Sequence, residues 1–133
     1  MDPLVVDASA VLAILLDEDD GPGFAALLAT AGDCWISPVN YWEASAVVES
    51  RNNPLISRGL DDLLRAARIT IAAIDAEQAM IARSAYRDFG KGRHTAGLNL
   101  GDCFAYALAK QKDAAILAKG SEFGRTDLRL RRP

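Results

Sequence analysis

Four acidic residues stand where apolar segments of this chain begin or break: Asp7, Glu43, Asp102 and Glu122. Asp7 directly follows the apolar run at 4–6, and Glu122 follows the run at 115–118 and a turn at Gly120. An acidic side chain at the edge of a core is costly unless it is paired or bound to a metal. Because no equal number of cations lies nearby in the sequence, these acids indicate a shared cation and predict a metal-dependent enzyme.

The ligand atoms of such a site would be oxygens. The chain has one histidine, His94, which excludes a site built from several histidines. Carboxylate oxygens favour Mg²⁺ or Mn²⁺ over Zn²⁺. The two cysteines, Cys34 and Cys103, lack the CxxC spacing of metal or redox motifs, and we expect them to be reduced thiols.

Length and composition predict one globular domain spanning residues 1–133. Half of the residues are hydrophobic, which is enough for a core, and the net charge is −3. An acidic balance excludes a bulk nucleic-acid coat, so any contact with nucleic acid must come from a local basic patch. No apolar stretch reaches the ~18 residues of a membrane span, and the N-terminus lacks a basic signal-peptide region. We therefore expect a cytoplasmic protein.

The elements that must position the acids alternate along the chain. The pattern predicts strands at 4–7, 34–37, 69–74 and 115–118, and helices at 10–16, 24–31, 41–51, 56–68, 76–89 and 101–112. Ser9 is expected to cap the first helix and Asp75 the fifth. Residues 119–133 are expected to be loop, with one short strand near 128–130. Strands that alternate with helices indicate an α/β fold with a parallel sheet.

This arrangement favours one shared cleft. Sites in open α/β sheets form beyond the carboxyl ends of strands, where Asp7 and Glu122 are expected. Asp102 would lie at a helix N-terminus, where the helix dipole favours negative charge. Each acid also has a plain structural interpretation: Asp7 as a turn residue, Glu43 as a solvated helix residue and Asp102 as a helix-terminal acid. None of them is specific by itself.

Taken in order and spacing, the motifs are more specific. They are Val5-Val6-Asp7-Ala8-Ser9-Ala10, a helical Glu43, the segment Gly92–Lys110 and the segment Leu117–Asp127. With these motifs the chain resembles a PIN domain, and most of all the VapC toxins of bacterial VapBC toxin–antitoxin pairs. The resemblance covers nearly the whole chain, and Gly92–Lys110 is its most specific part. It implies a PIN-like α/β/α sandwich with a central, mainly parallel sheet.

The resemblance also implies a function: a Mg²⁺-dependent endoribonuclease that hydrolyses RNA phosphodiester bonds, a cognate antitoxin that occupies the cleft, and a homodimer. Asp7, Glu43 and Asp102 match the family's three acidic positions. We expect Asp7 and Asp102 to be the main metal ligands, and Glu43 a third ligand or a base that orients water. Carboxylate-held Mg²⁺ lowers the pKa of a bound water and clamps the phosphate.

The fourth acidic position departs from the family pattern. Many PIN domains have an aspartate about where Gly120 falls, and Ser121 and Glu122 follow it here. Two roles are open to Glu122 here: to replace that acid with its longer side chain, or to bind the metal only through water. Asp127 is a second acid nearby. The departure also motivates an alternative function, a catalytically weakened PIN module that only binds RNA or a partner.

Positive charge beside the acids would bind the RNA. Lys91, Arg93 and His94 lie in a glycine-rich loop that enters the helix of Asp102, and we expect them to contact phosphate. Ser9 joins this substrate-contacting set, although its hydroxyl could instead orient Asp7. The aromatic residues are expected in the core or at an interface rather than as platforms for bases: Trp35, Trp42, Phe104 and Tyr106.

Two further expectations complete the interpretation. Homodimerisation is assigned to the apolar helices around Val39–Val48 and Leu60–Ala67. A receiver-like phosphoacceptor is a competing enzyme, because it also gathers acids around Mg²⁺ on an α/β sheet. Lys119 roughly fits the lysine that such a protein has after its last strand, but the paired acids at the first strand are absent.

Overall fold

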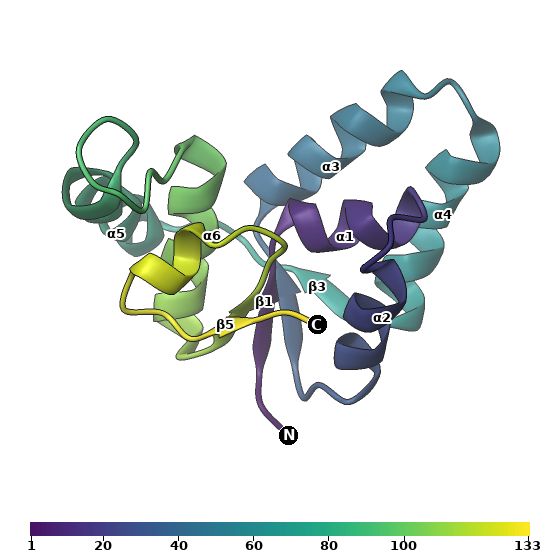
Figure 1. Ribbon diagram of the computed structural model, residues 1–133, viewed down its shortest axis with the longest axis horizontal. Helices are drawn as coiled ribbons and strands as arrows, with labels where there is room; N and C mark the ends of the chain where they lie inside the picture. The colour runs from purple at the N-terminus through teal and green to yellow at the C-terminus, as the bar shows by residue number, and fades with distance from the viewer.

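The computed structural model describes residues 1–133 as strands alternating with helices (Figure 1). The strands are β1 (Leu4–Val6), β2 (Cys34–Ile36), β3 (Ile69–Ile71), β4 (Ala115–Leu117) and β5 (Leu130–Arg131). The helices are α1 (Ala8–Leu15), α2 (Gly21–Ala29), α3 (Pro38–Ser50), α4 (Pro54–Ala66), α5 (Ala76–Phe89) and α6 (Leu100–Lys112), with a 3-10 turn, η1 (Glu122–Arg125). The predicted order of the main elements is therefore confirmed.

All five strands form one parallel sheet in the order β3-β2-β1-β4-β5. The central pair, β1 and β4, is fully buried, as expected of strands that are apolar at every position. Because β1 pairs with β2 on one side and β4 on the other, the chain reverses its direction of winding at β1. Ligand sites of open α/β sheets form at such a reversal.

Helices cover both faces of the sheet. Side chains alternate between faces along a strand, so Leu4 and Val6 pack in the core beneath α1, α2 and α4. Val5 points to the opposite face, where it meets Leu108 of α6. Helix α5 packs along α6 on that same side (Figure 1). The result is the α/β/α sandwich with a parallel sheet that the sequence predicted.

The start of α1 corrects one expectation. Asp7, not Ser9, caps this helix: its side chain accepts a hydrogen bond from the Ser9 backbone N–H at 3.0 Å. Ser9 lies inside the first turn, which leaves its hydroxyl free for another role. The predicted cap of α5 is confirmed, since the Asp75 carboxylate accepts from the Gln78 N–H at 2.8 Å.

Other ends of helices and strands differ by a few residues from the expected positions. Helices α3 and α4 begin at Pro38 and Pro54, because proline fits the first helical turn, where its missing N–H is not needed. Helix α6 begins at Leu100 because Asn99 caps it. Strand β3 ends at Ile71, three residues earlier than expected.

The last segment has more structure than expected. The predicted loop over 119–133 contains η1, anchored by the fully buried Phe123, and the strand β5 lies at 130–131 rather than 128–130. Strand β5 has only two residues, too few for a periodic pattern to reveal, and its pairing with β4 defines it. No helix has the length and apolar character that crossing a membrane requires.

Leu98 ties the glycine-rich loop to the core. It is fully buried in the cluster of α5 and α6. We expect Leu98→Ala to lower the free energy of unfolding by about 2–5 kcal/mol, because it leaves a cavity. Urea unfolding measures the loss. Leu55→Ala is the control: Leu55 is 74% exposed on α4, and its loss should change stability by no more than ~0.5 kcal/mol. Equal losses in the two variants would contradict this assignment of the core.

Candidate active site

The four acids come from four elements that meet at the carboxyl edge of the sheet. Asp7 follows β1, and Glu43 lies on α3, which follows β2. Asp102 lies in the first turn of α6, and Glu122 begins η1 after β4. Helix α3 packs against both α1 and α6 at this edge. The structure thus brings together residues that are up to 115 positions apart in the sequence.

Ser9 orients Asp7. The Asp7 carboxylate is buried, and the Ser9 hydroxyl donates to its Oδ2 at 2.6 Å. The same hydroxyl oxygen accepts from the Lys119 backbone N–H at 3.0 Å. Ser9 therefore connects the end of β1 to the end of β4 and fixes the direction in which Asp7 points. This contact favours the orienting role for Ser9 over direct contact with substrate.

Asn40 and Gly101 fix Glu43. The Asn40 side chain is fully buried, and its Nδ2 donates to Glu43 Oε1 at 3.0 Å and to the Gly101 carbonyl at 3.1 Å. The Glu43 carboxylate lies so close to Gly101 that any side chain at that position would collide with it. Glycine at 101 therefore lets the carboxylate of α3 approach the N-terminus of α6.

Asp102 both caps α6 and faces the site. Its backbone N–H donates to Asn99 Oδ1 at 2.9 Å, and its Oδ2 accepts from the Asn99 N–H at 3.0 Å. This reciprocal capping box satisfies two N–H groups that the helix itself leaves unpaired. One oxygen, Oδ2, is used in the cap, and no hydrogen bond occupies Oδ1.

The acids act on one another electrostatically. Burial raises the pKa of Asp102 to about 6, and the charges of Asp7, Glu122 and Glu43 add to the rise against the opposing hydrogen bond from Asn99. Burial also raises the pKa of Asp7, opposed by the hydrogen bonds from Ser9 and increased by the charge of Glu122. Asp7 and Asp102 are thus both affected by the charge of a neighbouring acid, which is the behaviour expected of carboxylates that share a cleft.

Glu43 follows the same pattern. Burial raises its pKa, the hydrogen bond from Asn40 opposes the rise, and the charge of Asp7 adds to it. Raised pKa values in several neighbouring acids mean that the metal-free site resists full ionisation. A bound cation removes this resistance, because opposite charge favours the ionised form.

The acids are chemically suitable ligands for a hard divalent cation, but their side chains are not placed to coordinate one. The acids offer carboxylate oxygens, and no histidine or cysteine competes among them. However, no three acidic, histidine or cysteine side chains lie close enough together to hold one ion as they stand. Coordination would therefore require some of these side chains to turn from their positions in this structure.

The fourth acid is the most exposed of the set. Glu122 stands at the surface, and its carboxylate lies against Gly120, where a Cβ would collide with it. Asp127, the other acid considered for this position, is engaged elsewhere. It accepts from the Tyr106 hydroxyl at 2.7 Å and from Lys110 Nζ at 2.9 Å. Of the two, only Glu122 adds its charge to Asp7 and Asp102.

Two basic residues near the site already form contacts within the protein. Lys119 pairs with Glu18 at 2.6 Å and Asp20 at 3.3 Å, so the acidic run after α1 neutralises it. Arg125 donates to the Thr95 carbonyl at 2.9 Å, which attaches the glycine-rich loop to η1. These two side chains have structural roles as well as positive charge.

The three residues predicted to contact phosphate differ in how strongly contacts within the protein constrain their side chains. Lys91 is exposed at the edge of a cavity of about 620 Å³ that Tyr86 and Leu100 also line. The Arg93 guanidinium lies 5.6 Å from the centre of the Tyr86 ring. His94 is constrained: its Nδ1 accepts from the Ala96 N–H at 3.0 Å, and its ring meets the edge of Phe89.

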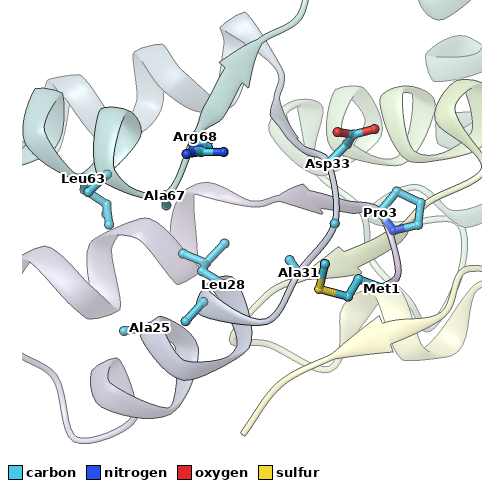
Figure 2. A pocket seen from close by; sticks show the side chains of 12 residues that line it. Met1, Pro3, Ala25, Leu28, Ala31, Asp33, Leu63, Ala67 and Arg68 are labelled. Carbon is cyan, nitrogen blue, oxygen red and sulfur yellow. The ribbon is translucent and has the colours of Figure 1, made fainter.

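A second cavity, of about 850 Å³, lies at the other end of the sheet (Figure 2). Its lining includes Pro3, Asp33 and Arg68, which precede β1, β2 and β3, so it opens at the amino ends of the strands. The rest of its lining is mostly apolar, from α2 and α4. It contains none of the four acids and is not the candidate site.

Sequence reasoning missed Asn40 and Gly101. An asparagine three residues before a glutamate on one helix is a signal, since residues at that spacing are neighbours on the helix surface. The contact with Gly101, 61 residues later, has no counterpart in the local pattern. It depends on how α3 and α6 dock.

Comparisons with known proteins identify the family of this chain. The family model of the PIN domain matches residues 4–128. The chain is 45% identical to Ribonuclease VapC28 of Mycobacterium tuberculosis over 124 residues, 92% of this chain and 93% of that protein. It is 46% identical to Ribonuclease VapC of Mycolicibacterium smegmatis over 125 residues, 94% of this chain and 97% of the relative. The chain therefore belongs to the VapC ribonucleases of the PIN-domain family.

Solved structures share the fold at low sequence identity. The crystal structure of VapC20 of Mycobacterium tuberculosis, a toxin that cleaves the sarcin-ricin loop, matches with a TM-score of 0.78 at 14% identity and covers 98% of this chain and 99% of its own. VapBC2 of Rickettsia felis, bound to a DNA fragment from its promoter, matches with a TM-score of 0.75 at 18% identity and 97% coverage of both chains. These likenesses confirm the predicted fold.

The raised pKa of Asp102 predicts how metal-free stability depends on pH. In the folded protein this carboxyl keeps its proton up to about pH 6, whereas its unperturbed pKa is 3.8. Between these values deprotonation favours the unfolded chain, so stability falls as pH rises. We expect Asp102→Asn to be more stable than the wild type at pH 7 without metal, and the difference to vanish near pH 4. Urea unfolding across this range measures it.

The control for this experiment is Asp61→Asn, on the exposed face of α4. It should leave the pH profile of the wild type unchanged. A gain in stability from Asp102→Asn that is the same at pH 4 and pH 7 would contradict the electrostatic cause.

Proposed function

We propose that this protein is the toxin of a type II toxin–antitoxin system, a metal-dependent endoribonuclease that hydrolyses RNA phosphodiester bonds. The observation that supports it most is the convergence of Asp7, Glu43 and Asp102 at the carboxyl edge of the sheet, where burial raises the pKa of each and the charge of a neighbouring acid adds to the rise. Full-length relatives at 40–46% identity carry the name VapC ribonuclease, which supports the same activity.

Each acid has a proposed role. Asp7 and Asp102 bind the metal, Glu43 is a third ligand or orients the attacking water, and Glu122 approaches from the exposed side as the fourth. When bound, the cation lowers the pKa of water and stabilises negative charge on the phosphate. Ser9 orients Asp7, and Asn99 keeps Asp102 at the start of α6.

The proposed metal is Mg²⁺, with Mn²⁺ as the alternative. Both are hard cations that prefer oxygen ligands, and the site offers carboxylates alone. The three acids that are partly or fully buried resist ionisation without a cation, which favours a divalent ion over a proton as the occupant at neutral pH.

The RNA is proposed to lie across the loop at 91–98 and the acidic edge. Lys91 and Arg93 are exposed at the start of this loop, which leads directly into α6 and Asp102. Contacts to phosphate position the chain without reading its sequence. His94 is expected to contribute less, because its Nδ1 accepts from the Ala96 N–H and its ring packs against Phe89 at the end of α5. We place this activity in the cytoplasm, where its RNA substrate is found.

RNA cleavage by purified protein, freed of any antitoxin, tests the proposal. We expect cleavage of structured RNA that depends on Mg²⁺ or Mn²⁺ and that falls by ~100-fold or more in Asp7→Asn and in Asp102→Asn. The metal supplies several kcal/mol of charge stabilisation, and each ~1.4 kcal/mol is a factor of ten in rate. Gel analysis of labelled RNA measures the rates.

Asp127→Asn is the matched control. It removes the same charge from an acid that binds Tyr106 and Lys110, so cleavage should persist. Wild-type protein that binds RNA but does not cleave it with either metal would support instead the catalytically weakened PIN module. Gly120, in place of an acid, would then be the first position to change.

The cognate antitoxin is the proposed protein partner. Structural neighbours include toxin–antitoxin complexes from Klebsiella pneumoniae and Haemophilus influenzae. We expect a small protein, encoded beside this one, to occupy the acidic cleft with a basic side chain and to inhibit cleavage. An acidic cleft attracts such a side chain by opposite charge.

A homodimer is proposed as well, and only part of the surface expected for it is apolar and exposed. Leu60, Leu63 and Leu64 of α4 pack into or against the core, so they offer no free apolar face. Within Val39–Val48 of α3, Trp42 is 69% exposed, and this part of the expectation stays a proposal. Further exposed apolar surface lies on α5 and the start of α6, where Tyr86 and Leu100 are 45% and 65% exposed and line one cavity. Apolar patches of this kind mark protein interfaces.

This surface predicts the effect of one substitution. Leu100→Lys should convert the dimer to a monomer, because it places a charge in the buried apolar interface. Light scattering coupled to size-exclusion chromatography measures the mass. Leu55→Lys is the control: it adds the same charge at the exposed end of α4 and should remain dimeric. A wild-type mass of one chain at high concentration would remove the dimer altogether.

A further inference from the structure

The Asn40 side chain forms hydrogen bonds to both helices of the acidic site. It is fully buried on α3, one turn before Glu43. Its Nδ2 donates to Glu43 Oε1 at 3.0 Å on its own helix and to the Gly101 carbonyl at 3.1 Å on α6. Gly101 is adjacent to Asp102, so this amide connects Glu43 to the helical turn that carries Asp102.

The chemistry of the contact fixes the amide in one orientation. A carboxylate and a carbonyl both accept hydrogen bonds and donate none, so only the NH₂ end of the amide can face them. The other end, Oδ1, is buried without a partner. An unpaired buried acceptor destabilises the folded protein, and the two hydrogen bonds of Nδ2 must offset that cost.

The contact also determines which part of Glu43 is free. Oε1 is engaged by Asn40, and the carboxylate lies against Gly101, where no side chain can fit. Oε2 forms no hydrogen bond within the protein. The Glu43 carboxylate is therefore fixed relative to the start of α6, with one oxygen left for a ligand.

We propose that Asn40 is a positioning residue of the active site, which holds the Glu43 carboxylate at the N-terminus of α6 so that Glu43 and Asp102 bind the same divalent ion. The inference rests on the proposed metal site and adds a residue to it. Partners that orient metal ligands in this way affect metal affinity as well as stability. A residue that only packs the core would affect stability alone.

The chain contains a matched control for this distinction. Gln78 is also a buried amide, and its Nε2 donates to the Ala73 carbonyl at 2.9 Å and to Gln111 Oε1 at 2.7 Å. Its Oε1 is likewise buried without a partner. It lies on α5 and reaches the C-terminal end of α6, away from Asp102. Gln78→Leu therefore removes the same kind of interaction outside the site.

The experiment compares Mn²⁺ binding by the wild type, Asn40→Leu and Gln78→Leu, measured from the signal of free Mn²⁺ in electron paramagnetic resonance. Thermal unfolding without metal is measured in parallel. We expect both variants to lose stability, but only Asn40→Leu to raise the dissociation constant of Mn²⁺, by about 10–100-fold. Unchanged Mn²⁺ affinity in Asn40→Leu, or an equal loss in Gln78→Leu, would overturn the inference.

If the wild type binds no Mn²⁺, the proposed metal site itself is wrong. This outcome differs from one in which the wild type binds Mn²⁺ and Asn40→Leu binds it equally well, which would overturn only the role of Asn40. If Asn40→Leu does not fold, nitrogen-edited NMR of the wild type gives the answer without a variant. The side-chain NH₂ signals of Asn40 should shift when Mg²⁺ is added, and those of Gln78 should not. Asn40 signals that stay in place while Mg²⁺ binds would overturn the inference.

Discussion

The burial of several neighbouring carboxylates is the constraint on which the rest of this structure depends. Burial raises the pKa of Asp102 to about 6, and the like charges of Asp7, Glu122 and Glu43 add to the rise. The fold must supply the free energy to bring these groups together. It does so with two fully buried central strands, β1 and β4, and with polar contacts from Ser9, Asn40 and Asn99 that fix Asp7, Glu43 and Asp102 separately.

Each contact serves the backbone and the site at once. Asp7 caps α1 and Asp102 completes the capping box of α6, so two of the acids stabilise the helices that present them. A carboxylate at a helix N-terminus is also favoured by the helix dipole, which offsets part of the repulsion. This double use explains how a small domain tolerates several acids at one edge. Glu43 lies within a helix and lacks this benefit, which makes its contact with Asn40 more important.

The main part of the fold was predictable because its signals are local. Apolar runs such as 4–6 and 115–117 identify buried strands, and Asp75 identifies the start of α5. The exchange of roles between Asp7 and Ser9 was not predictable, since either side chain can cap a helix and only the backbone direction decides. The short strand β5 was also displaced, because its pairing with β4, not its own two residues, defines it.

The candidate site was predictable to the extent that its chemistry depends on residue types. Carboxylates are costly at a core edge, so Asp7, Glu43 and Asp102 could be selected as candidates, and in each of them burial and the charge of a neighbouring acid raise the pKa. The residues that hold these acids in place could not be selected from the sequence. Asn40 acts through Gly101, and the requirement for glycine there arises only when α3 docks on α6. Docking of two helices depends on the whole core, so the residues that complete a site are less visible in sequence than the residues that react.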